Sequence, residues 1–244
     1  MTSPPSGQSP RPPRLVIRDP AAIPVIGVDS ALPPIDHAKL TADAVRQRFA
    51  RPPQWQPEFS GDGLPTGADP AAASVLVPLV QRERGLTVLL TQRTAHLRDH
   101  AGQVSFPGGR AEPGDADVVD TALREAVEEI GLSRARVDVL GTLHPYHTVT
   151  NFVVTPVVAL VSPPFELRLD PFEVAEAFEV PLDFLMNPAH HRRHRFEFAG
   201  GQRQFLSMPW DGPHAGGEEG PPHTYFIWGA TASMLRNFYR FLSV

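Results

Sequence analysis

The chain has 244 residues, of which 41% are hydrophobic and 20% charged, and its formal net charge is −5. This composition is typical of a globular protein with a substantial core, and the negative charge argues against a broad nucleic-acid-binding surface. The sequence contains no cysteine, which excludes disulfides, a thiolate nucleophile and metal sites with cysteine ligands. No apolar run is long enough for a membrane span, and no secretory signal follows the first residues. We therefore expect a cytoplasmic protein without membrane or nucleic-acid partners.

The first 70 residues are predicted to lie outside the main domain. Residues 1–35 are rich in proline and serine, a composition that buries too little apolar surface to fold, so we expect a disordered tail there. Residues 36–50 predict one short helix, because apolar side chains recur on one stripe, at Leu40, Ala44, Val45 and Phe49. Arg51-Pro52-Pro53 ends this helix, and residues 36–70 as a whole form an extension of helix and irregular loop.

Residues 71–244 are predicted to form the main domain. Short runs rich in β-branched residues predict strands over 73–80, 86–92, 103–106, 137–143, 152–161, 174–180, 195–198, 204–207 and 225–228. Helices are expected over 117–130, 181–186 and 230–242. The irregular alternation of strands and helices, with several hairpins, predicts an α/β fold in which helices pack on a mixed sheet.

The helix predicted over 117–130 carries acidic residues where they weaken a helix. Glu125 and Glu129 are four residues apart and share a face, with Glu128 beside them, so their like charges repel. They also lie in the last two turns, where the helix dipole favours cations. An apolar stripe is expected to pack on the sheet, formed by Val119, Leu123, Ala126, Val127 and Ile130, and Gly131 is expected to cap the helix.

This conflict has two interpretations. The simpler one is a solvated acidic face. The other is a functional site, since local rules tend to fail there and a divalent cation between the carboxylates would convert repulsion into attraction. Oxygen ligands without neighbouring histidine or cysteine favour Mg²⁺ or Mn²⁺ over Zn²⁺.

The segment in front of the helix supports the second interpretation. Gly108 and Gly109 follow a predicted strand, and paired glycines allow the backbone to approach a ligand closely. A loop and a helix with carboxylates near its far end can enclose a metal from two sides. The alternative is an ordinary connection from strand to helix, which would need one glycine.

Residues 109–132 resemble the Nudix box, G-x5-E-x7-R-E-U-x-E-E-x-G-U, where U is aliphatic. Residues 124–132, Arg-Glu-Ala-Val-Glu-Glu-Ile-Gly-Leu, match its second half. Asp115 stands where the box has its first glutamate, and eight residues rather than seven separate it from Arg124. This form is associated with the coenzyme A pyrophosphatase branch. Residues 89–109 are similar to that branch's signature, roughly L-L-T-x-R-(S/T)-x3-R-x3-G-x-V-x-F-P-G-G, and a looser resemblance extends over residues 73–180.

The resemblance implies an α/β/α Nudix sandwich that hydrolyses a nucleoside diphosphate linked to another group, and a fold that often forms homodimers. In this branch the substrate is coenzyme A or its derivatives, and the products are 3′,5′-ADP and 4′-phosphopantetheine. By motif position, Glu125 and Glu129 would be the main ligands of Mg²⁺ or Mn²⁺, with Glu128 assisting. The carbonyl of Gly108 or Gly109 would be a further ligand, and Arg124 would orient a carboxylate. Alternatives are a Nudix enzyme acting on ADP-ribose or another nucleoside diphosphate derivative, and a non-catalytic Nudix-like nucleotide-binding regulator, which would be expected to lose the glutamates.

Further residues are candidates for substrate contact and proton transfer. Arg93 and Arg98 could hold substrate phosphates bidentately, or could pair with nearby acidic side chains. Glu173 and Glu176 are candidates to accept the proton of the attacking water, or are exposed charges at a strand edge. The histidines of residues 190–195 lie among arginines, and this run predicts a solvated basic surface.

Overall fold

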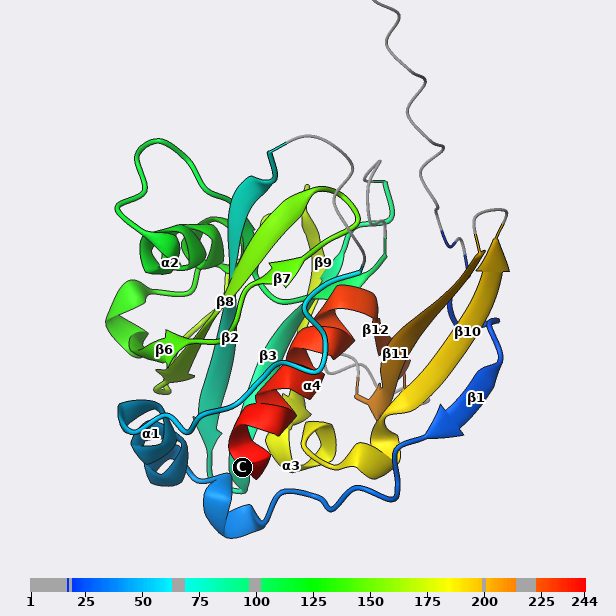
Figure 1. Cartoon of the computed structure of the whole chain (residues 1–244). Coiled ribbons are helices and arrows are strands. Elements are labelled where there is room, and N and C mark those ends of the chain that lie inside the picture. Colours follow the sequence, from blue (N-terminus) through cyan, green and yellow to red (C-terminus); the bar gives the residue numbers. More distant parts are fainter. Residues whose placement is uncertain (1–16, 18, 63–68, 97–101, 199–200, 214–222) are drawn as a thin grey trace, which may run out of the picture.

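A mixed sheet of eight strands forms the centre of the computed structural model, which describes residues 17, 19–62, 69–96, 102–198, 201–213 and 223–244 (Figure 1). Its two long central strands, β2 (Ala71–Arg82) and β8 (Phe152–Val161), run parallel from the pair Ala71–Phe152 to the pair Val80–Val161. The sheet order is β4-β3-β2-β8-β6, and β5, β7 and β9 pair with β2, β8 and β3 respectively. The remaining strands are β3 (Gly85–Arg93), β4 (Val104–Ser105), β5 (Gly108–Arg110), β6 (Val137–Thr142), β7 (Tyr146–His147) and β9 (Val174–Pro181).

Helices cover both faces of this sheet. In β2, alternate side chains point to opposite faces: Leu76 packs with α2 (Val118–Ile130), whereas Val77 packs with α4 (Gly229–Ser243) and α3 (Leu182–Leu185). Because both faces are buried, the strand is a nearly continuous apolar run, as expected for the centre of a covered sheet. The predicted α/β class with a mixed sheet and a helix on each side is confirmed.

A second sheet was not predicted. It is antiparallel, with the order β1-β10-β11-β12, and comprises β1 (Val25–Val28), β10 (Arg192–Phe198), β11 (Gly201–Gly212) and β12 (His223–Trp228). The prediction of a disordered tail over residues 1–35 is wrong for Val25–Val28, because this apolar run finds a pairing partner in β10. Residues 1–16 lie outside the described part of the chain.

The N-terminal extension packs against α4. The predicted helix over 36–50 is divided into a 3-10 turn (His37–Lys39) and α1 (Ala42–Ala50), because the Thr41 side chain accepts a hydrogen bond from the amide of Ala44 and starts a new helix. Asn237 of α4 makes two hydrogen bonds with the backbone of Phe59, at 3.1 and 2.7 Å. The extension is therefore part of the same core.

A buried cluster of charged side chains joins the extension, the second sheet and α4. Arg236, only 1% exposed, donates to Glu58 at 2.7 Å and lies 3.3 Å from Asp29, and Arg193 pairs with both acids. The Nδ1 atom of the His191 ring accepts from Arg236 at 3.0 Å, and Nε2 donates to the carbonyl of Leu185 at 2.8 Å.

The prediction of a solvated basic surface over residues 190–195 is wrong for two of its histidines. His191 is buried in the cluster just described. His194 is also buried, and its ring nitrogens lie 2.8 Å from Ser207 Oγ and from the carbonyl oxygen of Ile23. His191 lies just before β10 and His194 lies within it, stacked on Phe205 with ring centroids 4.6 Å apart, so different contacts bury the two rings. Among the described residues, no helix has the length and apolar character needed to cross a membrane.

Candidate active site

Helix α2 begins and ends at capping residues, and its buried side chains pack on the sheet. Asp117 caps the start, accepting hydrogen bonds from the amides of Val119 and Asp120 at 2.9 and 2.8 Å. Gly131, at φ 68°, ends the helix in the left-handed conformation, as predicted. Ala122, Ala126 and Ile130 are the buried apolar residues, whereas Val127, predicted for the buried stripe, is 41% exposed.

The glycine pair lies between β2 and the carboxylates of α2. In β5, Gly108 pairs with Val75 and Gly109 with Ser74. A Cβ atom on Gly108 would lie 2.6 Å from Val75 Cα, and its φ is +156°. A Cβ atom on Gly109 would lie 2.5 Å from Glu125 Cδ and 2.7 Å from its Oε2. Each glycine is thus required for its own reason, and Gly109 brings the backbone directly against a helix carboxylate.

Glu129 is a carboxylate buried with little compensation. Its side chain is 5% exposed and accepts a hydrogen bond from the amide of Gly108 to Oε2 at 3.1 Å. Burial raises the pKa of Glu129 to about 8, although the Gly108 amide and the charge of Arg93 act in the opposite direction. Such a perturbed acid is typical of a functional site.

Glu125 lies one turn earlier, and its environment has a similar effect. Its side chain is 15% exposed, and Arg124 Nη1 lies 3.0 Å from its Oε1. Burial raises the pKa of Glu125 despite Arg124, and the negative charges of Glu128 and Glu173 raise it further. Two neighbouring carboxylates that resist ionisation would both be stabilised by one bound cation, so the donor set fits a hard divalent metal ion.

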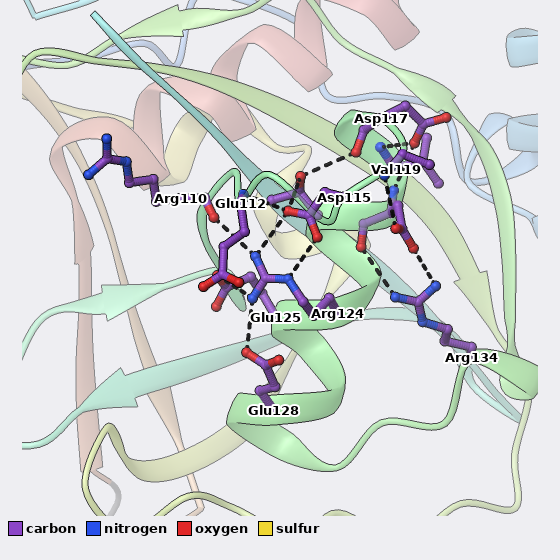
Figure 2. A network of polar contacts seen from close by, with 12 residues as sticks. Arg110, Glu112, Asp115, Asp117, Val119, Arg124, Glu125, Glu128 and Arg134 are labelled. Atoms are coloured by element: carbon purple, nitrogen blue, oxygen red, sulfur yellow. Dashed lines mark hydrogen bonds and ion pairs between the residues drawn. The ribbon is translucent and has the colours of Figure 1, made fainter.

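Arg124 is the centre of a hydrogen-bond network in front of the helix (Figure 2). It donates to both oxygens of Asp115, at 2.8 and 3.1 Å, to the carbonyl of Arg110 at 3.0 Å and to Glu128 at 2.9 Å. The Arg124 hydrogen bonds hold the pKa of Asp115 well below its usual range. Asp115, at the shifted position of the motif, therefore orients Arg124, and Arg124 in turn orients Glu125 and Glu128.

The structure brings some predicted residues together and leaves others apart. Glu125, Glu129, Gly108, Gly109 and Arg93 form one cluster. Glu128 is 58% exposed and turned toward Arg124, and within the described ranges no three acidic or histidine side chains already converge as a metal cage. Arg98 lies outside the described residues.

Glu176 faces away from this cluster. It accepts a hydrogen bond from the hydroxyl of Tyr225 at 2.6 Å. Phe178, two residues along the same strand, stacks on Tyr225 and belongs to the core on the α4 side of the sheet. The sequence offers Glu173 and Glu176 as candidates from the same later segment, but it does not fix which face of the sheet the Glu176 side chain takes.

Glu173 is the later carboxylate that lies at the cluster. The turn before β9 is tied to α2 by the amide of Asp170, which donates to the carbonyl of Glu129 at 2.8 Å, and to the end of β3 by the amide of Thr94, which donates to the carbonyl of Glu173 at 3.0 Å. Glu173 Oε2 lies 3.8 Å from Arg93 Nη2. No local sequence signal indicates these contacts, which depend on the packing of three distant segments.

The chain matches a family model and named relatives. A family model described as "NUDIX domain" matches residues 70–199. A Citrobacter koseri protein named "Uncharacterized Nudix hydrolase NudL" is 38% identical over 204 residues, which are 83% of this chain and 95% of that protein.

Two solved structures are similar to parts of the chain. A Caenorhabditis elegans Ap4A hydrolase binary complex shares 21% identity, with a TM-score of 0.41 over 48% of this chain and 85% of that one. The NUDIX domain of Shewanella oneidensis NrtR, complexed with ADP ribose, shares 18% identity, with a TM-score of 0.38 over 56% of this chain and 82% of that one.

Proposed function

Since the chain belongs to the Nudix family of hydrolases, which act on pyrophosphate bonds, we propose that its substrate is coenzyme A or a derivative, cleaved to 3′,5′-ADP and 4′-phosphopantetheine. The observation that carries the hydrolytic part is the pair of carboxylates Glu125 and Glu129, half-buried and buried with raised pKa values against Gly108-Gly109. The coenzyme A part is supported by the resemblance of residues 89–109 to that branch's signature.

The residues that would hold Mg²⁺ or Mn²⁺ are Glu125 and Glu129, with Glu128 and a carbonyl of the glycine pair as further oxygen donors. When bound, the metal ion supplies charge neutralisation for the diphosphate and lowers the pKa of the attacking water. Gly108 holds one oxygen of Glu129 through its amide. Arg124 keeps Glu125 and Glu128 pointing toward the same side of the helix.

The protein would bind the diphosphate through Arg93, whose guanidinium lies beside the carboxylates. A guanidinium that donates two parallel hydrogen bonds fixes a phosphate in position as well as attracting it.

The proton of the attacking water would pass to a carboxylate of this cluster, and Glu173 is better placed to take it than Glu176.

The test is incubation of the protein with coenzyme A and Mg²⁺, with mass detection of 4′-phosphopantetheine and 3′,5′-ADP. ADP-ribose is assayed in parallel as an alternative substrate, and Glu129→Gln is assayed in parallel as the site variant. We expect product from coenzyme A, and a loss of turnover of orders of magnitude in Glu129→Gln, since lost charge stabilisation at such a site typically costs ~2–4 kcal/mol of barrier. Turnover of ADP-ribose alone would overturn the substrate assignment. Full activity of Glu129→Gln at saturating Mg²⁺ would overturn the site, and binding of nucleotides without any turnover would indicate a regulator.

A further inference from the structure

Arg93 lies between two carboxylates, and neither is a close partner of its guanidinium. Its Nη1 lies 3.6 Å from Glu129 Oε1, and its Nη2 lies 3.8 Å from Glu173 Oε2. Both separations are longer than a good charge-assisted hydrogen bond, which is about 2.7–2.9 Å. Within the described part of the chain, the guanidinium has these two ion pairs and no hydrogen bond, although it carries five N–H donors.

The surroundings of the guanidinium are fixed more firmly than the guanidinium itself. The backbone of Arg93 donates to the carbonyl of Gln103 at 2.9 Å, and the next residue, Thr94, donates from Oγ1 to the carbonyl of Phe172 at 2.8 Å. The backbones of Glu129 and Glu173 are held by the hydrogen bonds between α2, the turn before β9 and the end of β3, and the Gly108 amide holds one carboxylate oxygen of Glu129. The head group of Arg93 is therefore the part of this cluster that can change partner at least cost.

The charges at the cluster explain why a cation resides there. Glu129 is almost fully buried, and Glu125 and Glu173 add negative charge nearby. An unpaired buried carboxylate is costly, so a positive charge within 4 Å stabilises the metal-free protein. A divalent ion held by Glu129 would neutralise the same carboxylate that Arg93 faces, so the two cations would compete for this carboxylate.

We propose that Arg93 is a resident counter-ion for Glu129 and Glu173, that metal binding displaces its guanidinium, and that the released guanidinium then binds the diphosphate of the substrate. This inference rests on the proposed function and adds an order of events to it. It implies that Arg93 weakens metal binding to the free protein. It also implies that metal and diphosphate favour each other's binding through Arg93, in addition to their direct contact.

The first test uses Arg93→Gln and calorimetric titration with Mn²⁺ alone. We expect Mn²⁺ to bind about fivefold more tightly to Arg93→Gln than to the wild type, which corresponds to the loss of one loosely paired arginine and carboxylate. Arg82→Gln is the matched control, because Arg82 is another arginine that pairs with a glutamate, Glu179 of β9, away from the cluster. Its Mn²⁺ affinity should equal that of the wild type.

The second test repeats the Mn²⁺ titration with ADP present as a diphosphate probe. In the wild type, ADP should tighten Mn²⁺ binding, and in Arg93→Gln this effect should fall about fivefold. Arg93→Lys keeps the charge without the planar fork, so its affinity for Mn²⁺ alone should stay within about twofold while the effect of ADP falls. This variant keeps the test decisive if Arg93→Gln does not fold.

The outcomes separate the two proposals. Mn²⁺ affinity that is unchanged or weaker in Arg93→Gln, in a protein whose wild type binds Mn²⁺ and cleaves coenzyme A, overturns the exchange of partners and leaves the proposed function intact. An undiminished effect of ADP in Arg93→Lys also overturns it. A wild type that neither binds Mn²⁺ nor cleaves a diphosphate overturns both.

Discussion

Alanine substitutions at the two adjacent glycines should affect different properties, the stability of the fold at Gly108 and turnover at Gly109. In Gly108→Ala, the added Cβ meets backbone atoms, the carbonyl oxygen of Ser74 and, at 2.6 Å, Val75 Cα, and the residue must adopt φ +156°. Neither clash can be relieved by a side-chain rotation. Unfavourable φ costs about 1–3 kcal/mol and overpacking about 1–3 kcal/mol, so the free energy of unfolding should fall by roughly 3–5 kcal/mol.

In Gly109→Ala, the added Cβ meets the carboxylate of Glu125, the far end of a flexible side chain. The carboxylate can move aside, so the free energy of unfolding should change by less than about 1 kcal/mol. Displacing a catalytic group by about 1 Å can cost about 100-fold in rate, so turnover should fall by one to two orders of magnitude.

Urea unfolding followed by circular dichroism measures the free energy of unfolding, and product formation from coenzyme A measures turnover. Gly114→Ala is the matched control, because a Cβ there meets nothing within 4 Å, and it should leave both unchanged. Wild-type stability in Gly108→Ala would refute the packing described for β5. Wild-type turnover in Gly109→Ala would show that the position of Glu125 does not matter to the reaction.

Two further predictions concern titratable groups outside the cluster of Glu125 and Glu129. Burial lowers the pKa of His191 from 6.5 to about 4, so the unfolded chain binds the extra proton first. Stability should therefore fall as pH drops from about 6.5 to about 4, by up to about 3 kcal/mol, and urea unfolding of His191→Gln should lack this contribution. Glu176→Gln should keep turnover within about threefold of the wild type, because Glu176 faces Tyr225 rather than the cluster. A loss comparable to that of Glu129→Gln would instead place Glu176 in the reaction.

Local features of the chain could be predicted because they depend on neighbours in sequence. Gly131 ends α2 where the apolar periodicity stops, and the turn between β2 and β3 lies where charged residues interrupt two β-branched runs. The spacing of Glu125 and Glu129 places both on one helix face whatever surrounds the helix. These features depend on the period of a helix or strand and on backbone preferences of single residues.

The burial of polar groups could not be predicted in this way. Asp115 is identified by the motif, yet its role as the partner of Arg124 depends on how the loop folds back on the helix. His191 resembles a surface residue in sequence, but the tertiary structure buries it between the carbonyl of Leu185 and Arg236 of α4. The second sheet requires β1 to pair with a strand more than 160 residues further along the chain.

The sequence by itself determined the helix, the glycine pair and which carboxylates we propose as metal ligands, because each follows from spacing within about 30 residues. Only the tertiary structure decided which charged groups share the site. Arg93 and Glu173 are 80 positions apart, and they meet Glu129 because β3, the turn before β9 and the end of α2 converge at one edge of the sheet. Burial and charge pairing depend on contacts between distant segments, and those contacts set the pKa values on which the chemistry of the site depends.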